Sequence, residues 1–261
     1  MSQAIADVLD EAVKLDLKQT VANLVTEDDE PVDNVCTEKH QYLLTRTLYS
    51  SWTPPPDELH PSGKRKFWAA ADIAIFPSVH QQPLVPDVFV SLDVEPPADW
   101  HETRSYFFWE YGKAPEVMLE IVSNRKGGEL GNKLYHYARM GALYYVVYDP
   151  ENHLSDDVLR VYELRGKRYQ LRDDYALPEL GLRLTFWHGL IEDKEADWLR
   201  WCDADGNLLP TPDERAALEN QARRKAEAKF RKEAKARKQA EDRAAQLAAK
   251  LRELGVDPDK L

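Results

Sequence analysis

The sequence contains little cysteine, and its two cysteines, Cys36 and Cys202, lie far apart without a CxxC or cysteine/histidine spacing. A zinc site and a disulfide framework are therefore not indicated. Long hydrophobic runs are also missing, since no window approaches the roughly 18 apolar residues that a membrane span needs. The N-terminal stretch MSQAIADVLDEAVKLDLK carries acids where a signal peptide has a basic flank and an apolar block. We therefore expect a cytoplasmic protein without a membrane partner.

The chain as a whole also lacks an excess of positive charge, because its formal net charge is −11 at pH 7. This balance argues against a protein that coats nucleic acid, which needs clustered lysine and arginine to neutralise phosphates. The charge is uneven, however, because residues 213–252 contain 13 Lys or Arg against 7 Asp or Glu. With 43% hydrophobic residues in 261, the rest of the chain can bury a core. We expect an acidic globular body with a basic appendage.

Three parts can be distinguished along the chain. Residues 1–35 form a loosely amphipathic N-terminal lead-in segment, and residues 36–210 carry the patterns of a folded domain. Residues 211–261 contain a stretch rich in Ala, Lys, Arg, Glu and Gln without internal glycine or proline, which predicts one long basic helix. Its apolar positions are mostly alanine before Leu247, so the heptad pattern of a coiled coil is weak. A solvated helix and a helix that pairs with a partner both remain open.

The folded part mixes helical and strand patterns. Residues 38–51 have helical spacing, with Thr37 at the N-cap position, and ELGNKLYHYARMG predicts a second helix that ends at Gly141. Strands are expected in FWAAADIAIF, PLVPDVFVSL, EVMLEIV, LYYVVYDP, VLRVYEL, KRYQLR and LGLRLTF.

Two carboxylates stand inside otherwise apolar, strand-forming runs, Asp87 in VPDVFV and Glu120 in EVMLEIV. Alternation along a strand places Glu120 on the same face as Met118 and Val122. An ionised carboxylate there costs several kcal/mol unless a cation or hydrogen bonds compensate it. Two such acids on neighbouring strands repel each other unless they share a divalent metal, and Mg²⁺ prefers oxygen ligands. The alternative is that Asp87 begins a turn after Pro86 and that Glu120 pairs with a lysine or arginine elsewhere.

The residues around these acids resemble the PD-(D/E)XK nuclease superfamily and, more narrowly, the Uma2 family of restriction-endonuclease-like proteins. The resemblance extends from about Glu38 to Pro210. It is carried by Pro86-Asp87, Glu120-Ile121-Val122-Ser123, Lys133 with Tyr137, Gly141 and the strand that ends at Asp149-Pro150. It implies an α/β fold with a restriction-endonuclease-like core, in which a mixed β-sheet is flanked by helices. It also implies Mg²⁺ or Mn²⁺ as cofactor and DNA as the substrate of phosphodiester hydrolysis.

The resemblance assigns the metal ligands to Asp87 and Glu120, with the backbone carbonyl of Ile121 as a further candidate. Glu38 matches an additional acid that related nucleases often supply from the first helix. A favourable charge at a helix N-terminus explains Glu38 at least as well.

The superfamily pattern places a lysine two residues after the second acid, and here that position is Val122. In similar family members the lysine lies in the following helix, at the position of Lys133. Lys126, in the intervening loop, is the competing candidate. The substitution at Val122 leaves open whether the site is active.

Three functional hypotheses follow. The first is a Mg²⁺-dependent endodeoxyribonuclease that uses no organic cofactor. The second is a catalytically inactive module that binds nucleic acid or protein on a nuclease scaffold, because fold does not guarantee function. The third assigns the long helix to joining subunits. The resemblance favours a homodimer, since cleavage of two DNA strands suits two-fold symmetry.

Overall fold

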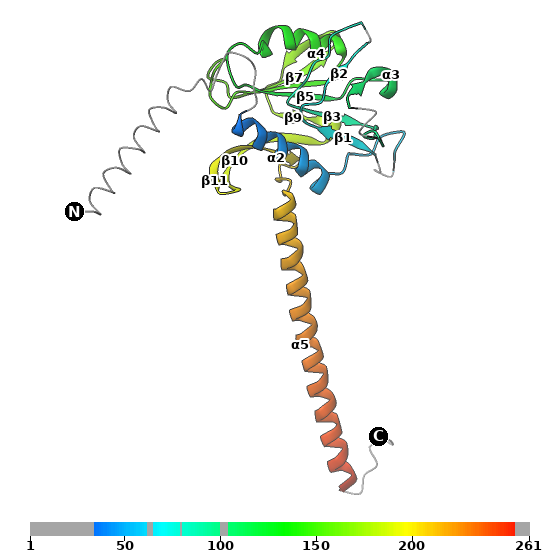
Figure 1. Cartoon of the computed structure of the whole chain (residues 1–261). Helices are drawn as coiled ribbons and strands as arrows, with labels where there is room; N and C mark the ends of the chain where they lie inside the picture. The colour runs from blue at the N-terminus through cyan, green and yellow to red at the C-terminus, as the bar shows by residue number, and fades with distance from the viewer. Residues whose placement is uncertain (1–33, 62–64, 79, 100–103, 254–261) are drawn as a thin grey trace, which may run out of the picture.

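The structure is a computed structural model that describes residues 34–61, 65–78, 80–99 and 104–253 (Figure 1). Residues 1–33 of the expected N-terminal lead-in segment lie outside these ranges. The fold is mixed α/β with a long C-terminal helix, which confirms the predicted fold class.

A six-stranded mixed sheet with the order β1-β3-β5-β6-β7-β8 forms the centre of the body. Its strands are β1 (Phe67–Ala70), β3 (Val88–Leu92), β5 (Val117–Ile121), β6 (Tyr144–Tyr148), β7 (Leu159–Arg165) and β8 (Arg168–Leu171). The β5–β6 pair is parallel, and the other neighbours are antiparallel. Parallel neighbours need a crossover connection, which here contains the π-helical turn η1 (Glu129–Lys133) and helix α4 (Leu134–Met140). This connection returns the chain past the end of β5.

Both faces of the central strands are buried, because successive side chains of a strand point to opposite sides of the sheet. Val117, Leu119 and Ile121 face a core shared with α2 (Val35–Ser51) and the sheet β9–β10–β11. Met118 and Val122 face a second core on the side of α4. The alternation predicted for this strand is therefore confirmed, and it places Glu120 on the α4 side. Figure 1 shows α4 and α2 on opposite sides of the sheet.

The remaining elements complete these two layers. The bounds are β2 (Ile75–Phe76), β4 (Tyr106–Phe107), α3 (Phe108–Tyr111), β9 (Ala176–Leu177), η2 (Pro178–Leu180), β10 (Leu182–Ile191) and β11 (Lys194–Asp203).

Three local predictions need correction. The run FWAAADIAIF forms two strands, β1 and β2, because the chain bends between them at Asp72, whose φ is 54°. Strand β3 begins only at Val88, so Asp87 lies in a bend just before the strand. Helix α2 is capped by Asn34, whose side chain accepts a hydrogen bond from the backbone N–H of Thr37. Thr37 is therefore inside the helix.

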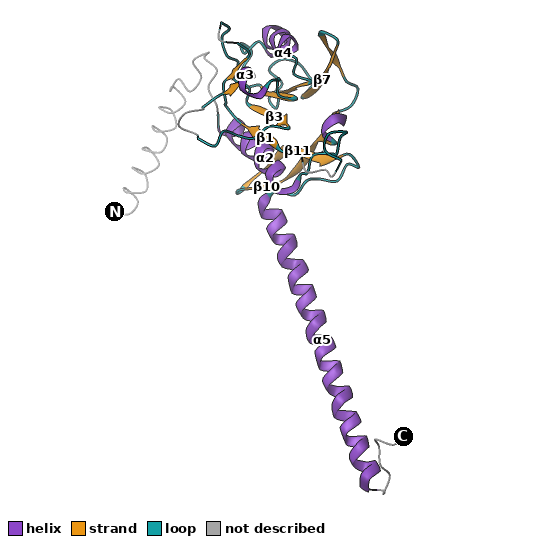
Figure 2. Cartoon of the chain, turned by 90° about the vertical axis from the view of Figure 1, so that its right-hand side faces the viewer, coloured by secondary structure: helices purple, strands orange, loops and turns teal. Residues whose placement is uncertain are grey.

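Helix α5 (Pro212–Glu253) extends from the body as one continuous helix, as predicted (Figures 1 and 2). Its first turn is attached through Arg200 of β11, which is 2% exposed. The Arg200 guanidinium donates to both carboxylate oxygens of Glu214, at 2.9 and 2.6 Å, and to the carbonyl of Leu209 at 2.8 Å. Within the described ranges, no helix is long and apolar enough to cross a membrane.

We expect Arg200→Met to lower the free energy of unfolding by about 2 kcal/mol, because it removes bidentate and carbonyl hydrogen bonds from a buried site. Glu214 keeps access to solvent, which limits the cost. The matched control is Arg223→Met in the exposed part of α5, where an ion pair of 3.9 Å with Glu227 should contribute less than about 0.5 kcal/mol. Urea unfolding of both variants measures the difference. Equal stability of the two would contradict a structural role for Arg200.

Candidate active site

A polar pocket of about 290 Å³ lies at the C-terminal end of β5, next to η1. Four of its lining residues are acids, namely Asp72, Asp87, Glu120 and Glu129. Of the described residues that line it, Lys133 is the one basic side chain. Strand β5, the bend before β3, the bend after β1 and the turn η1 each contribute to it.

Glu120 is held at this pocket by two donors while only 2% of its surface is exposed. Its Oε1 accepts a hydrogen bond from the Tyr137 hydroxyl at 2.6 Å, and its Oε2 accepts one from Lys133 Nζ at 2.9 Å. Burial raises the pKa of Glu120, and the charge of Lys133 and both hydrogen bonds oppose that rise. The carboxylate is therefore fixed in orientation between a cation and a hydroxyl.

Lys133 remains protonated in this environment. Burial alone lowers the pKa of Lys133, but the charge of Glu120 and the hydrogen bond to it outweigh that effect and raise the pKa above its usual value. Its ammonium group is thus available as a hydrogen-bond donor at the pocket.

Asp87 reaches the same pocket from the bend just before the neighbouring strand β3. Its Oδ2 accepts a hydrogen bond of 2.6 Å from the backbone N–H of Ile121, the residue after Glu120. Its Oδ1 accepts one of 3.3 Å from Gln41 Nε2. The alternative interpretation placed Asp87 at the start of a turn, and Asp87 does lie in a bend. Its side chain nevertheless accepts a hydrogen bond from β5, the strand that carries Glu120. The structure brings Asp87, Glu120 and Lys133 together.

Two other candidates lie elsewhere. The side chain of Glu38 is 60% exposed, lies 3.3 Å from Lys39 Nζ and does not line the pocket. Gln41, one turn later on α2, contacts Asp87 instead. Lys126 is exposed in the loop after β5 and also does not line the pocket. Val122 is buried in the core on the α4 side.

The sequence interpretation missed two of the lining acids. Asp72 accepts a hydrogen bond of 2.9 Å from Gln41 Nε2, the same amide that contacts Asp87. Glu129 is 5% exposed, and its Oε1 lies 3.7 Å from Lys133 Nζ. The spacing of four residues between Glu129 and Lys133 was a signal for Glu129, whereas nothing local marks Asp72.

The donor set of this pocket fits a hard divalent cation. Four carboxylates and one lysine line the pocket, and neighbouring like charges disfavour their common ionisation. One oxygen, Glu129 Oε2, is buried without a hydrogen-bond partner among the described residues. Carboxylate oxygens are the ligands that Mg²⁺ and Mn²⁺ prefer. A bound cation would compensate the negative charge of the pocket and would pair with Glu129 Oε2.

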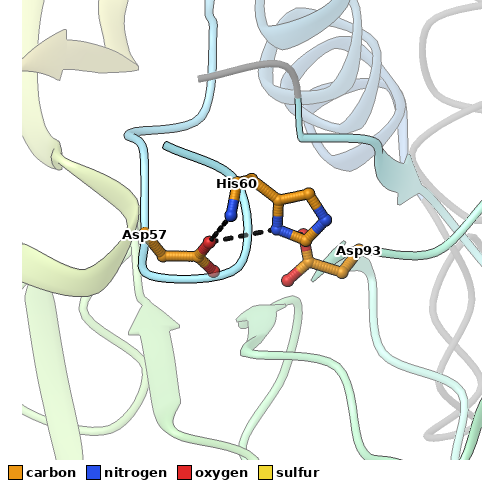
Figure 3. A group of neighbouring side chains, drawn as sticks. All are labelled: Asp57, His60 and Asp93. Atoms are coloured by element: carbon orange, nitrogen blue, oxygen red, sulfur yellow. Dashed lines mark hydrogen bonds and ion pairs between the residues drawn. The ribbon is translucent and has the colours of Figure 1, made fainter. Parts of the chain in front are cut away.

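In the described ranges, the acids of the pocket do not bring three ligand atoms within 4.8 Å of one another, whereas one group elsewhere does. Asp57, His60 and Asp93 offer ligand atoms within 4.8 Å of one another (Figure 3). Asp93 follows β3 whereas Asp87 precedes it, so the group lies at the other end of that strand. Arg65 Nη2 already lies 2.6 Å from Asp93 and 3.4 Å from Asp57. The hydrogen bond from Arg65 lowers the pKa of Asp93, so this group has its own compensating cation.

Comparison with known proteins yields one family. A family model, Uma2, described as "Putative restriction endonuclease", matches residues 37–190. All five charged residues of the pocket lie within this match. No curated protein and no solved structure matches the chain.

Proposed function

Because the chain belongs to the Uma2 family of restriction-endonuclease-like proteins, we propose that it is a Mg²⁺- or Mn²⁺-dependent endonuclease that hydrolyses phosphodiester bonds in DNA. The observation that carries this proposal is the meeting of Asp87, Glu120 and Lys133 at one pocket. Lys133 would supply the amine that the superfamily pattern places two residues after the second acid, where this chain has Val122.

The chemistry of each residue supports this assignment. Asp87 and Glu120 would hold the ion, which when bound polarises a phosphate and lowers the pKa of a water molecule. Lys133 would orient the attacking water or stabilise negative charge that develops on the phosphate. Tyr137 fixes the second oxygen of Glu120, so this carboxylate keeps one orientation.

Basic residues beside the pocket support a DNA substrate. Arg125 and Lys126 are exposed in the loop that follows β5, where a phosphate backbone could approach them. The approach to the pocket is therefore the favoured DNA-binding region.

The proposal is tested by incubating the full chain with supercoiled plasmid DNA. We expect nicked or linear DNA with Mg²⁺ or Mn²⁺ and intact plasmid when EDTA removes the ion. A plasmid that stays supercoiled with both ions would reject the proposal.

The second candidate is a binding module without catalysis on the same scaffold. It is favoured by Val122 at the superfamily's lysine position and by the net charge of −11. Such a module should bind Mn²⁺ poorly or not at all and should leave DNA intact, so calorimetry and the plasmid assay together separate the two candidates.

We further propose that the protein is a homodimer joined along α5. The helix exposes Leu218, Phe230 and Leu247, at 56%, 72% and 62%. A chain that ends at Gln221 retains the Arg200–Glu214 attachment but loses most of this surface. Light scattering should give a dimer for the full chain and a monomer for the shortened one. A shortened chain that remains dimeric would remove α5 from this role.

A further inference from the structure

We propose that Glu129 is a third carboxylate ligand of the divalent cation, presented by the turn η1. This inference rests on the proposed function in one respect, namely that Asp87 and Glu120 are the other carboxylate ligands. Glu129 is neither part of the motif around these acids nor on a strand.

The burial of the Glu129 carboxylate is the first observation that supports a ligand role. Glu129 lines the pocket, is 5% exposed and has an oxygen, Oε2, that is buried without a hydrogen-bond partner in the described ranges. Its Oε1 lies 3.7 Å from Lys133 Nζ, which donates at 2.9 Å to Glu120 instead. A buried carboxylate oxygen without a partner is costly. A cation in the pocket would remove that cost for Glu129.

The backbone of η1 directs this side chain. The turn begins after Gly128, which has a φ of 72°, and the N–H of Lys133 donates to the carbonyl of Gly128 at 3.1 Å. The hydroxyl of Tyr145 donates to the carbonyl of Glu129 at 3.0 Å and anchors the start of the turn. Short π-helical turns occur frequently at functional sites. The position of Glu129 is therefore built into the crossover connection.

Gly127 provides the space for the carboxylate. A Cβ atom at Gly127 would overlap Glu129 Oε1, while the φ of Gly127 lies outside the left-handed region. Alanine is thus compatible with the backbone at this position, and the obstacle is the Glu129 side chain. Gly127→Ala should displace the carboxylate without changing any charge.

An alternative role for Glu129 is to position Lys133 through their ion pair. If Glu129 only positioned Lys133, Gly127→Ala would leave metal affinity nearly unchanged because the charge stays at the pocket. Glu129→Gln would then weaken metal affinity only slightly, because the ammonium group of Lys133 is less compensated. A ligand would weaken metal affinity when it is neutralised or displaced.

The experiment is calorimetric titration of the full chain with Mn²⁺ in the absence of DNA. We expect Glu129→Gln and Gly127→Ala each to weaken Mn²⁺ binding by at least about tenfold. Their combination should add little to either change, because both act on one carboxylate. Glu38→Gln is the matched control for the loss of a glutamate charge, and Asp93→Asn tests the group in Figure 3. Thermal unfolding verifies the fold of each variant.

The outcomes separate this inference from the proposed function. Wild-type affinity in a folded Glu129→Gln variant overturns the inference and leaves the proposed function standing. Mn²⁺ binding that depends on Glu129 in a protein that does not cut DNA supports the inference and rejects the proposed function. A wild-type chain that does not bind Mn²⁺, or binding that depends on Asp93 instead of Glu129, overturns the inference.

Discussion

Glu120→Gln is expected to lower the rate of Mg²⁺-dependent DNA cleavage by at least about a thousandfold. The substitution keeps the shape of the side chain and an oxygen that can accept from Tyr137. It removes the negative charge that would bind the cation and that compensates Lys133, 2.9 Å away. Initial cleavage rates of supercoiled plasmid, with protein in excess, measure the effect.

The controls for this prediction test charge and folding separately. Glu38→Gln removes the same charge from α2 at an exposed site away from the pocket, and its cleavage rate should match that of the wild type. Asp87→Asn should lose activity as Glu120→Gln does. Circular dichroism establishes that each variant is folded. Wild-type cleavage by a folded Glu120→Gln protein would eliminate the metal-ligand role of Glu120.

Lys133→Met is expected to lower the cleavage rate by at least about a hundredfold, since it removes the cation that would stabilise charge on the reacting phosphate. Lys126→Met, in the exposed loop after β5, should reduce the rate less than about threefold. The comparison distinguishes the two lysines that the sequence left as alternatives. The opposite ranking would transfer the role to Lys126.

Metal affinity separates a catalytic Lys133 from a merely structural one. Removal of a positive charge beside the ligand Glu120 should preserve or strengthen Mn²⁺ binding, because less repulsion opposes the ion. A slow enzyme that still binds Mn²⁺ therefore indicates a role in the reaction. Loss of both cleavage and binding would indicate that Lys133 only maintains the pocket.

Much of the fold could be predicted from local sequence pattern. The alternation in EVMLEIV correctly placed Glu120 on one face of β5, and the composition after Pro212 correctly indicated α5. Such patterns depend on near neighbours in the chain, because strand and helix periods are local properties. The same local pattern predicted Asp87 inside a strand, and that detail was wrong because β3 begins one residue later.

Sequence by itself determined most strands of the central sheet, the main helices including the basic appendage, and the two acids that are unusual among apolar residues. Only the tertiary structure decided which side chains share a pocket. Lys133 meets Glu120 because the β5–β6 pair is parallel and its crossover passes the end of β5. Asp72 and Glu129 join them from a bend and a π-helical turn. Such meetings depend on strand order and connection geometry, which join residues distant in sequence and leave no periodic signal.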